Sequence, residues 1–292
     1  MKSELLHIGA ISLLFLGIAL IFTAPLGMNL TTHIPGYSGD INQYYWCHWW
    51  FGEAMARGMN PWWTDMLWHP NGTSLVFSTN RFVSAFLGWL ITPLTGQTTA
   101  YNIIILLSFI VSALGVYLFV RELTGNNLAA FAAAFIFTFN PWKFHKLQCH
   151  HFLMSTWFFG FALWMLLRVV KREDRPIKHG ILLGVLGGVT IYESLFLFDF
   201  LLLALGLLTL LFALLDRKHI WRMSTLKGLL AAGLTFIVLA TPMLVLIAVA
   251  LPEYGSLPYA GGAEIYSNDL LHLLWPSPLP WSEFGGNPAD LF

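Results

Sequence analysis

A single carboxylate near the N-terminus is the first residue that could do chemistry. Asp40 lies in the aromatic-rich run Gly36-Tyr-Ser-Gly-Asp-Ile-Asn-Gln-Tyr-Tyr-Trp-Cys-His-Trp-Trp50. Asp40 and Gln43 have the spacing of a capping box, in which the carboxylate accepts hydrogen bonds from the first turn of a helix. A helix N-terminus also favours the ionised carboxylate, which is the form that a general base or a metal ligand needs. The two roles are compatible, and the local pattern leaves both open.

Basic side chains gather in a second stretch, Phe139-Asn-Pro-Trp-Lys-Phe-His-Lys-Leu-Gln-Cys-His-His151. Pro141 is expected to end the apolar helix before it. The candidate phosphate ligands of this stretch are Lys143, His145, Lys146, His150 and His151. They could bind a lipid phosphate or diphosphate, or they could simply snorkel toward headgroup phosphates. His145, Cys149 and His150 also have a helical spacing that could hold zinc.

Three further residues are candidates for substrate contact. Glu193 stands at the end of an apolar stretch, where an ionisable group is costly and is often functional, although it could also be a plain loop acid. His69 begins His69-Pro-Asn-Gly-Thr-Ser-Leu75, which has the composition of a structured turn. Trp46 could stack on a sugar ring, or it could anchor its helix in the membrane interface.

The composition predicts the elements that must position these residues. The chain has 292 residues, of which 57% are hydrophobic and 10% are charged, against roughly 25% charged in a typical soluble domain. We therefore expect one all-α, polytopic transmembrane domain over residues 1–292, because a spanning helix needs about 20 mainly apolar residues. The net charge is zero, so nothing indicates a nucleic-acid partner. The expected spans are 5–26, 100–120, 125–141, 150–169, 179–192, 195–215 and 227–250.

The basic residues predict the orientation. If the N-terminus is cytoplasmic and the apolar stretch 82–95 does not cross, eleven cations lie inside and four lie outside. The outer four are Arg57, Arg81, Lys143 and Lys146. We therefore expect 82–95 to be a re-entrant or interfacial helix, within a large outer loop 27–99. The chain stops in a second outer loop, 251–292, so we expect it to be the N-terminal part of a longer protein.

The motifs together resemble a family. They are Gly39-Asp40, Gly58-x-Asn60-Pro61, His69-Pro-Asn-Gly-Thr-Ser-Leu75, Asn102, Arg121-x-Leu-Thr-Gly125, Phe139-Asn-Pro-Trp-Lys-Phe-His-Lys and Trp275-Pro-Ser-Pro278. This pattern resembles the bacterial and archaeal multi-span proteins related to GT-C glycosyltransferases, including the membrane proteins labelled as related to 6-pyruvoyl-tetrahydropterin synthase. The resemblance covers nearly the whole chain and implies a GT-C-like helical bundle in the plasma membrane, with interfacial helices in its first outer loop.

The resemblance also implies an activity. GT-C enzymes pass a sugar from a polyprenyl-phosphate donor to an acceptor at the outer face, and an acid of the first outer loop serves as general base or metal ligand. Carried over to this chain, that acid is Asp40. Asp40 stands without an adjacent carboxylate, so no metal site is assigned, although a divalent cation stays open as a cofactor. Two other functions are open: a transporter or flippase of lipid-linked glycans, and a non-catalytic membrane scaffold.

Overall fold

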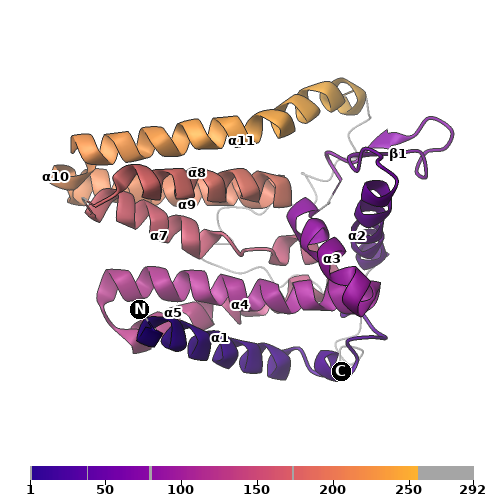
Figure 1. The fold of residues 1–292 in the computed structure, drawn as a ribbon, viewed down its shortest axis with the longest axis horizontal. Coiled ribbons are helices and arrows are strands. Elements are labelled where there is room, and N and C mark those ends of the chain that lie inside the picture. The colour runs from indigo at the N-terminus through magenta and orange to yellow at the C-terminus, as the bar shows by residue number, and fades with distance from the viewer. Residues whose placement is uncertain (1, 38, 79–80, 173, 256–292) are drawn as a thin grey trace, which may run out of the picture. The chain divides into compact units, whose positions relative to one another are not determined.

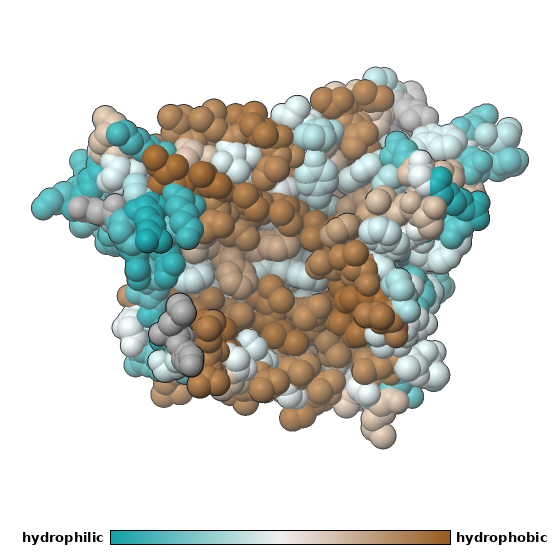
Figure 2. Space-filling view, viewed as in Figure 1, coloured by the Kyte–Doolittle hydropathy of each residue, from teal (hydrophilic) through white to brown (hydrophobic). Residues whose placement is uncertain are grey.

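The computed structural model is mainly helical in the residues that it describes. It describes residues 2–37, 39–78, 81–172 and 174–255. Within these residues, the helices long and apolar enough to cross a membrane are Ser3–Phe22, Gln97–Thr124, His151–Lys171, Leu195–Leu215 and Met223–Pro252. Figure 2 shows apolar side chains over the middle of the long helices and hydrophilic ones at their ends. These are the features of an all-α membrane protein.

The long helices run along one common direction in Figure 1. They are α1 (Lys2–Phe22), α4 (Gln97–Thr124), α7 (Phe159–Lys171), α8 (Pro176–Glu193), α9 (Leu195–Leu215) and α11 (Met223–Gly255). Shorter elements join them: α5 (Asn127–Thr138), α6 (Pro141–Cys149), the 3-10 turn η2 (His151–Met154) and α10 (Arg217–Ile220). The expected spans 125–141 and 179–192 correspond to α5 and α8, neither of which is among the five long apolar helices. With 12 residues, α5 is about 18 Å long, less than the roughly 30 Å of a bilayer core.

Ion pairs join the helix termini that carry most of the basic residues. Arg121 at the end of α4 pairs with Glu4 at the start of α1, and Lys171 at the end of α7 pairs with Asp216 just after α9. We call this the basic end of the bundle. The opposite end, the loop end, holds α2 (Gly39–Ala56), α3 (Phe82–Thr95) and the 3-10 turn η1 (Leu26–Met28). Basic side chains at the ends of α4 and α7 therefore lie at one end of the bundle, each paired with an acid.

Small residues let two pairs of helices approach closely. A Cβ atom at Gly160 of α7 would lie 2.2 Å from the Val116 backbone nitrogen of α4. A Cβ atom at Gly180 of α8 would lie 2.0 Å from the Gly228 carbonyl oxygen of α11. Such contacts are typical of membrane helices, whose association depends on close packing rather than on the hydrophobic effect.

The first loop forms a platform of short elements at the loop end. Figure 1 shows α2 standing across the direction of the long helices. With 14 residues, α3 has the bounds of the stretch 82–95 and, at about 21 Å, is too short for a full crossing. A two-stranded antiparallel hairpin, β1 (Trp63–Thr64) and β2 (Thr73–Ser74), connects α2 to α3. Its turn ends at Gly72, whose φ of 71° fits the Asn-Gly turn expected there.

The chain divides into two compact units, Met1–Ala250 and Leu251–Phe292. Of the second unit, the described part is 251–255, which ends α11. The rest of the expected outer loop 251–292, including Trp275-Pro-Ser-Pro278, lies outside the described residues.

Candidate functional site

The structure brings Asp40 next to His150. Oδ2 of Asp40 lies 3.4 Å from Nε2 of His150, and the side chains are 51% and 39% exposed. Asp40 sits in the first turn of α2, which begins at Gly39 rather than after Asp40 as expected. His150 is the C-cap of α6, and its Nδ1 lies 2.9 Å from Sγ of Cys149. The pair therefore combines a carboxylate that solvent can reach with an imidazole whose other ring nitrogen contacts Cys149.

A close backbone approach brings these two helix ends together. The N–H of Tyr37, just before α2, donates to the carbonyl oxygen of Gln148 on α6 over 3.1 Å. Gly36 has a φ of 104°, and a Cβ atom there would lie 2.8 Å from that same oxygen. Only glycine combines this backbone conformation with such a contact. Gly36 thus sets the position of Asp40 relative to α6.

Two basic side chains of α6, His145 and Lys146, lie near His150. His145 is exposed and Lys146 is partly exposed. Partial burial, together with the charge of Lys146, lowers the pKa of His150, while Asp40 acts in the opposite direction. The same two causes lower the pKa of His145. Both imidazoles are therefore mainly neutral at pH 7, and Lys146 supplies the positive charge near them.

Lys143, on the inward side of α6, is 1% exposed. Its Nζ donates to the Ser108 carbonyl oxygen, to Oγ of Ser112 and to Oγ1 of Thr156 over 3.1, 3.1 and 3.3 Å. Nζ also lies 4.9 Å from the ring centre of Phe109. Burial lowers the pKa of Lys143 to about 7. The structure thus places this predicted phosphate ligand among protein groups, and Lys146 is the lysine of α6 whose charge acts on His150.

Glu193, 1% exposed, is also an inward-facing residue. Its Oε2 accepts from the Ser84 N–H over 2.9 Å, and its Oε1 accepts from the Ser84 hydroxyl. Ser84 lies in the first turn of α3, where the N-cap residue, Arg81, contributes no side-chain cap. Glu193 therefore caps α3 from another part of the chain. Burial raises the pKa of its carboxyl group, against which the charge of Arg81 acts.

His151 faces the interior beside this network. Its Nδ1 accepts from the Tyr101 hydroxyl over 2.7 Å, which leaves Nε2–H to donate to the Leu147 carbonyl oxygen over 2.7 Å. The guanidinium of Arg81 lies 5.4 Å from the Tyr101 ring centre, and its Nη1 is 3.5 Å from the carbonyl oxygen of His151. The neighbours His150 and His151 thus point in different directions. The hydrogen bonds of the buried His151 hold the backbone in place, and this backbone positions the partly exposed His150.

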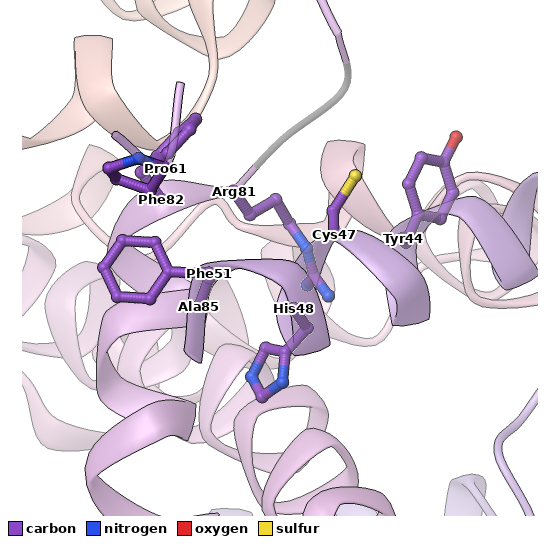
Figure 3. A pocket seen from close by; sticks show the side chains of 8 residues that line it. All are labelled: Tyr44, Cys47, His48, Phe51, Pro61, Arg81, Phe82 and Ala85. Carbon is purple, nitrogen blue, oxygen red and sulfur yellow. The ribbon is translucent and has the colours of Figure 1, made fainter. Parts of the chain in front are cut away.

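A small pocket lies between α2 and α3, and Figure 3 shows the Arg81 guanidinium pointing toward the ring of His48 inside it. Its lining is Tyr44, Cys47, His48, Phe51, Pro61, Arg81, Phe82 and Ala85. His48 is 4% exposed, and its Nδ1 lies 2.9 Å from the side-chain nitrogen of Gln97. Burial and the charge of Arg81 lower the pKa of His48 to about 3, so its ring is neutral. Sequence reasoning missed His48, and it counted Arg81 only as an outer cation.

The two remaining candidates lie elsewhere in the first loop. His69 is exposed in the turn between β1 and β2. The partly buried Trp46 stacks on Trp50, with ring centres 6.0 Å apart and planes 3° from parallel. In the part of the chain that the structure describes, no three His, Cys, Asp or Glu side chains form a group that could hold a metal ion. A divalent cation at Asp40 thus stays a prediction.

Comparison with known proteins places the chain in a family. A family model described as "Domain of unknown function (DUF6311)" matches residues 10–289. The chain belongs to the DUF6311 family. No curated protein and no solved structure matches it. Because the DUF6311 description records no reaction, an activity has to be argued from the site itself.

Proposed function

We propose that this DUF6311 protein is a membrane glycosyltransferase of the GT-C type. It would move a sugar from a polyprenyl-phosphate donor to a hydroxyl group of an acceptor, with Asp40 as general base. The observation that carries the proposal is the Asp40–His150 pair: a half-exposed carboxylate lies 3.4 Å from a histidine, at the loop end of a membrane-type helix bundle. The resemblance described above supplies the donor class.

The reaction assigns a task to each of these groups. Asp40 takes the proton of the acceptor hydroxyl as its oxygen attacks the anomeric carbon. The bond between that carbon and the phosphate oxygen breaks, and polyprenyl phosphate leaves with the bonding electrons. Lys146 and His145, which lie on the outward side of α6, stabilise the charge that develops on the phosphate. The chemistry balances without a redox partner.

The arrangement of charge supports an extracytoplasmic site. Arg121, Lys171 and Arg172 lie at helix termini of the basic end, and Asp40 lies at the loop end. Because positive residues favour the cytoplasmic side, we place the N-terminus of α1 in the cytoplasm and Asp40 at the outer face. Polyprenyl-phosphate sugars used at that face would reach the site from the bilayer.

Substitution of Asp40 by Asn tests the proposal. Membranes from cells that express the chain would receive undecaprenyl phosphate carrying radiolabelled glucose, mannose or galactose, and the label that leaves the lipid would be measured. General-base catalysis is worth about 10²- to 10⁴-fold, so Asp40→Asn should reduce transfer by at least about 100-fold. Asp65→Asn, the same change at an exposed acid of the β1–β2 turn, should leave transfer unchanged.

Three results would contradict the proposal. Equal transfer by wild type and Asp40→Asn would exclude Asp40 as the base. Label that crosses the membrane of sealed vesicles while still attached to its lipid would indicate a transporter. If replacing both Asp40 and Lys143 leaves the activity of the protein in cells unchanged, the chain would be a scaffold.

A further inference from the structure

A second polar cavity lies at the basic end, away from the proposed site. The ends of α1, α4 and α7 enclose it, and its lining is Glu4, Leu118, Arg121, Glu122, Trp164, Arg168 and Arg172. Three arginines face two glutamates, so the lining carries a net charge of 3 − 2 = +1. The proposed glycosyl transfer uses none of these residues.

Glu122 organises two of the arginines. Its Oε2 accepts from Nε1 of Trp164 over 2.5 Å and from Nε of Arg168 over 2.8 Å. Its Oε1 accepts from Nε of Arg172 over 2.7 Å. The Arg168 guanidinium also lies 4.0 Å from the ring centre of Trp164. One carboxylate that is 17% exposed therefore holds both guanidinium groups in fixed orientations.

The two arginines keep their terminal amino groups available. Both donate to Glu122 through Nε, and within residues 2–37, 39–78, 81–172 and 174–255 no hydrogen bond from an Nη atom of Arg168 or Arg172 is found. Arg121 differs, because its Nη1 and Nη2 both donate to Glu4, over 2.6 and 3.1 Å. The planar fork of a guanidinium group matches the geometry of phosphate oxygens.

The surroundings of the cavity suit a lipid. Leu5 and Leu6 follow Glu4 on α1 and are 64% and 74% exposed, and Leu123 follows Glu122 on α4 and is 55% exposed. A lipid with its phosphate in the cavity would find apolar helix surface for its acyl chains. Trp164 fits the same level, because amphipathic rings favour the boundary between hydrocarbon and headgroups.

We propose that Arg168 and Arg172, oriented by Glu122, bind the phosphate of an anionic lipid headgroup. The net positive lining selects anionic over zwitterionic headgroups. A free phosphate ion would engage the same two forks, so the experiment has to separate the two sources.

Purified full-length chain in a zwitterionic detergent tests this site. Native mass spectrometry would count bound dioleoyl-phosphatidylglycerol and dioleoyl-phosphatidylcholine, and thermal unfolding would measure protection by each lipid and by inorganic phosphate. We expect phosphatidylglycerol to be preferred, and its affinity to fall at least about tenfold when Arg168 and Arg172 are both replaced by Gln. The control pair Arg57→Gln with Arg217→Gln removes the same charge from exposed positions and should bind like wild type.

Single substitutions at Arg172 keep the test decisive if the double variant does not fold. The Arg172 side chain is 46% exposed, so Arg172→Gln and Arg172→Lys should both fold. Arg172→Lys keeps the charge but loses the fork, and we expect it to bind phosphatidylglycerol more weakly than wild type does. Equal binding by Arg172→Lys, or equal losses in the control pair, would overturn the site. Equal protection by millimolar inorganic phosphate would overturn the lipid as its ligand.

Discussion

The two acids Asp40 and Glu193 lie at the same end of the molecule and have different surroundings. Asp40 is about half exposed and faces a histidine, whereas Glu193 is 1% exposed and is already occupied by Ser84. A general base must be reachable by its substrate, and a buried carboxylate with its hydrogen bonds satisfied is better suited to hold a structure together. Exposure therefore makes Asp40 the better candidate for the proposed general base, and burial makes Glu193 the better candidate for a structural role.

The two lysines of α6 repeat this contrast three residues apart. Lys146 is partly exposed beside the pair, and Lys143 is sealed among Ser108, Ser112 and Thr156. The buried Lys143 joins α6 to α4, and the buried Glu193 joins α8 to α3. We call these two contacts the frame, and the more exposed Lys146 and Asp40 lie on the helices that it holds together.

Replacing Glu193 by Ala should have the largest effect on stability. The Ser84 N–H and hydroxyl would lose their acceptor in a buried place, and Arg81 would lose a nearby negative charge. Because each buried unsatisfied group costs roughly 1–3 kcal/mol, we expect the free energy of unfolding to fall by about 3 kcal/mol. Unfolding in mixed detergent micelles would measure it.

Glu53→Ala is the matched control for this change. Glu53 pairs with the exposed Arg57 one helical turn away, and such pairs contribute only about 0.3–0.5 kcal/mol. Glu193→Gln, whose amide oxygen can still accept from Ser84, should lose less than Glu193→Ala. Equal losses for Glu193→Ala and Glu53→Ala would show that Glu193 is not part of the frame.

Sequence patterns predict the elements of this fold better than its contacts. The apolar stretches 195–215 and 82–95 have the bounds of α9 and α3, because a run of apolar residues between polar ones is a local signal. The bond from Ser84 to Glu193 joins residues 109 positions apart, and no local pattern contains it. The burial of Lys143, by contrast, could have been predicted from the sequence. Lys143 lies four residues before the apolar Leu147 and therefore on the same face of the helix, and Leu147 is 7% exposed.

The juxtaposition of Asp40 and His150 was only partly predictable. The expected topology puts both residues on one side of the membrane, but it does not say which of two adjacent histidines faces the acid. The choice depends on packing, because His151 is held between the Tyr101 hydroxyl and the Leu147 carbonyl group. The close approach at Gly36, which sets the spacing of α2 and α6, has no signature beyond the glycine itself.

The buried Lys143 predicts a dependence of stability on pH. Its pKa is about 7 in the folded protein and 10.5 in the unfolded chain. Between these values the unfolded chain binds more protons, so stability rises with pH, by up to about 1.4 kcal/mol per pH unit. From pH 7 to pH 9 we expect a gain of roughly 2–3 kcal/mol, measured by unfolding in detergent.

Replacing Lys143 by Met should remove this rise of stability with pH, because the side chain then has no amine that can bind a proton. Lys146→Met, which removes the partly exposed lysine of the same helix, should keep it. If the pH dependence survives in Lys143→Met, another group is responsible, and Lys143 is not buried in its neutral form.

Replacing His150 by Ala should have the smallest effect and should act on activity alone. His150 is partly exposed and its Nε2 lies 3.4 Å from Asp40, so its loss removes one positioning contact of the carboxylate without opening a core. We expect transfer from the radiolabelled undecaprenyl donor to fall about tenfold, since a positioning contact to a charged group is worth roughly 1.5 kcal/mol. His33→Ala, at an exposed histidine of the first loop, is the control.

The pH profile shows whether His150 acts on Asp40. Burial and the charge of Lys146 lower the pKa of His150, so its ring gains a proton only in acid. A protonated His150 would bind the Asp40 carboxylate as an ion pair and weaken it as a base, and wild-type transfer should fall as the pH drops through the pKa of His150. His150→Ala should lose this limb, whereas a merely structural histidine would lower the rate and leave the shape of the profile unchanged. An unchanged pH profile would therefore show that the protonation of His150 does not affect Asp40 as a base.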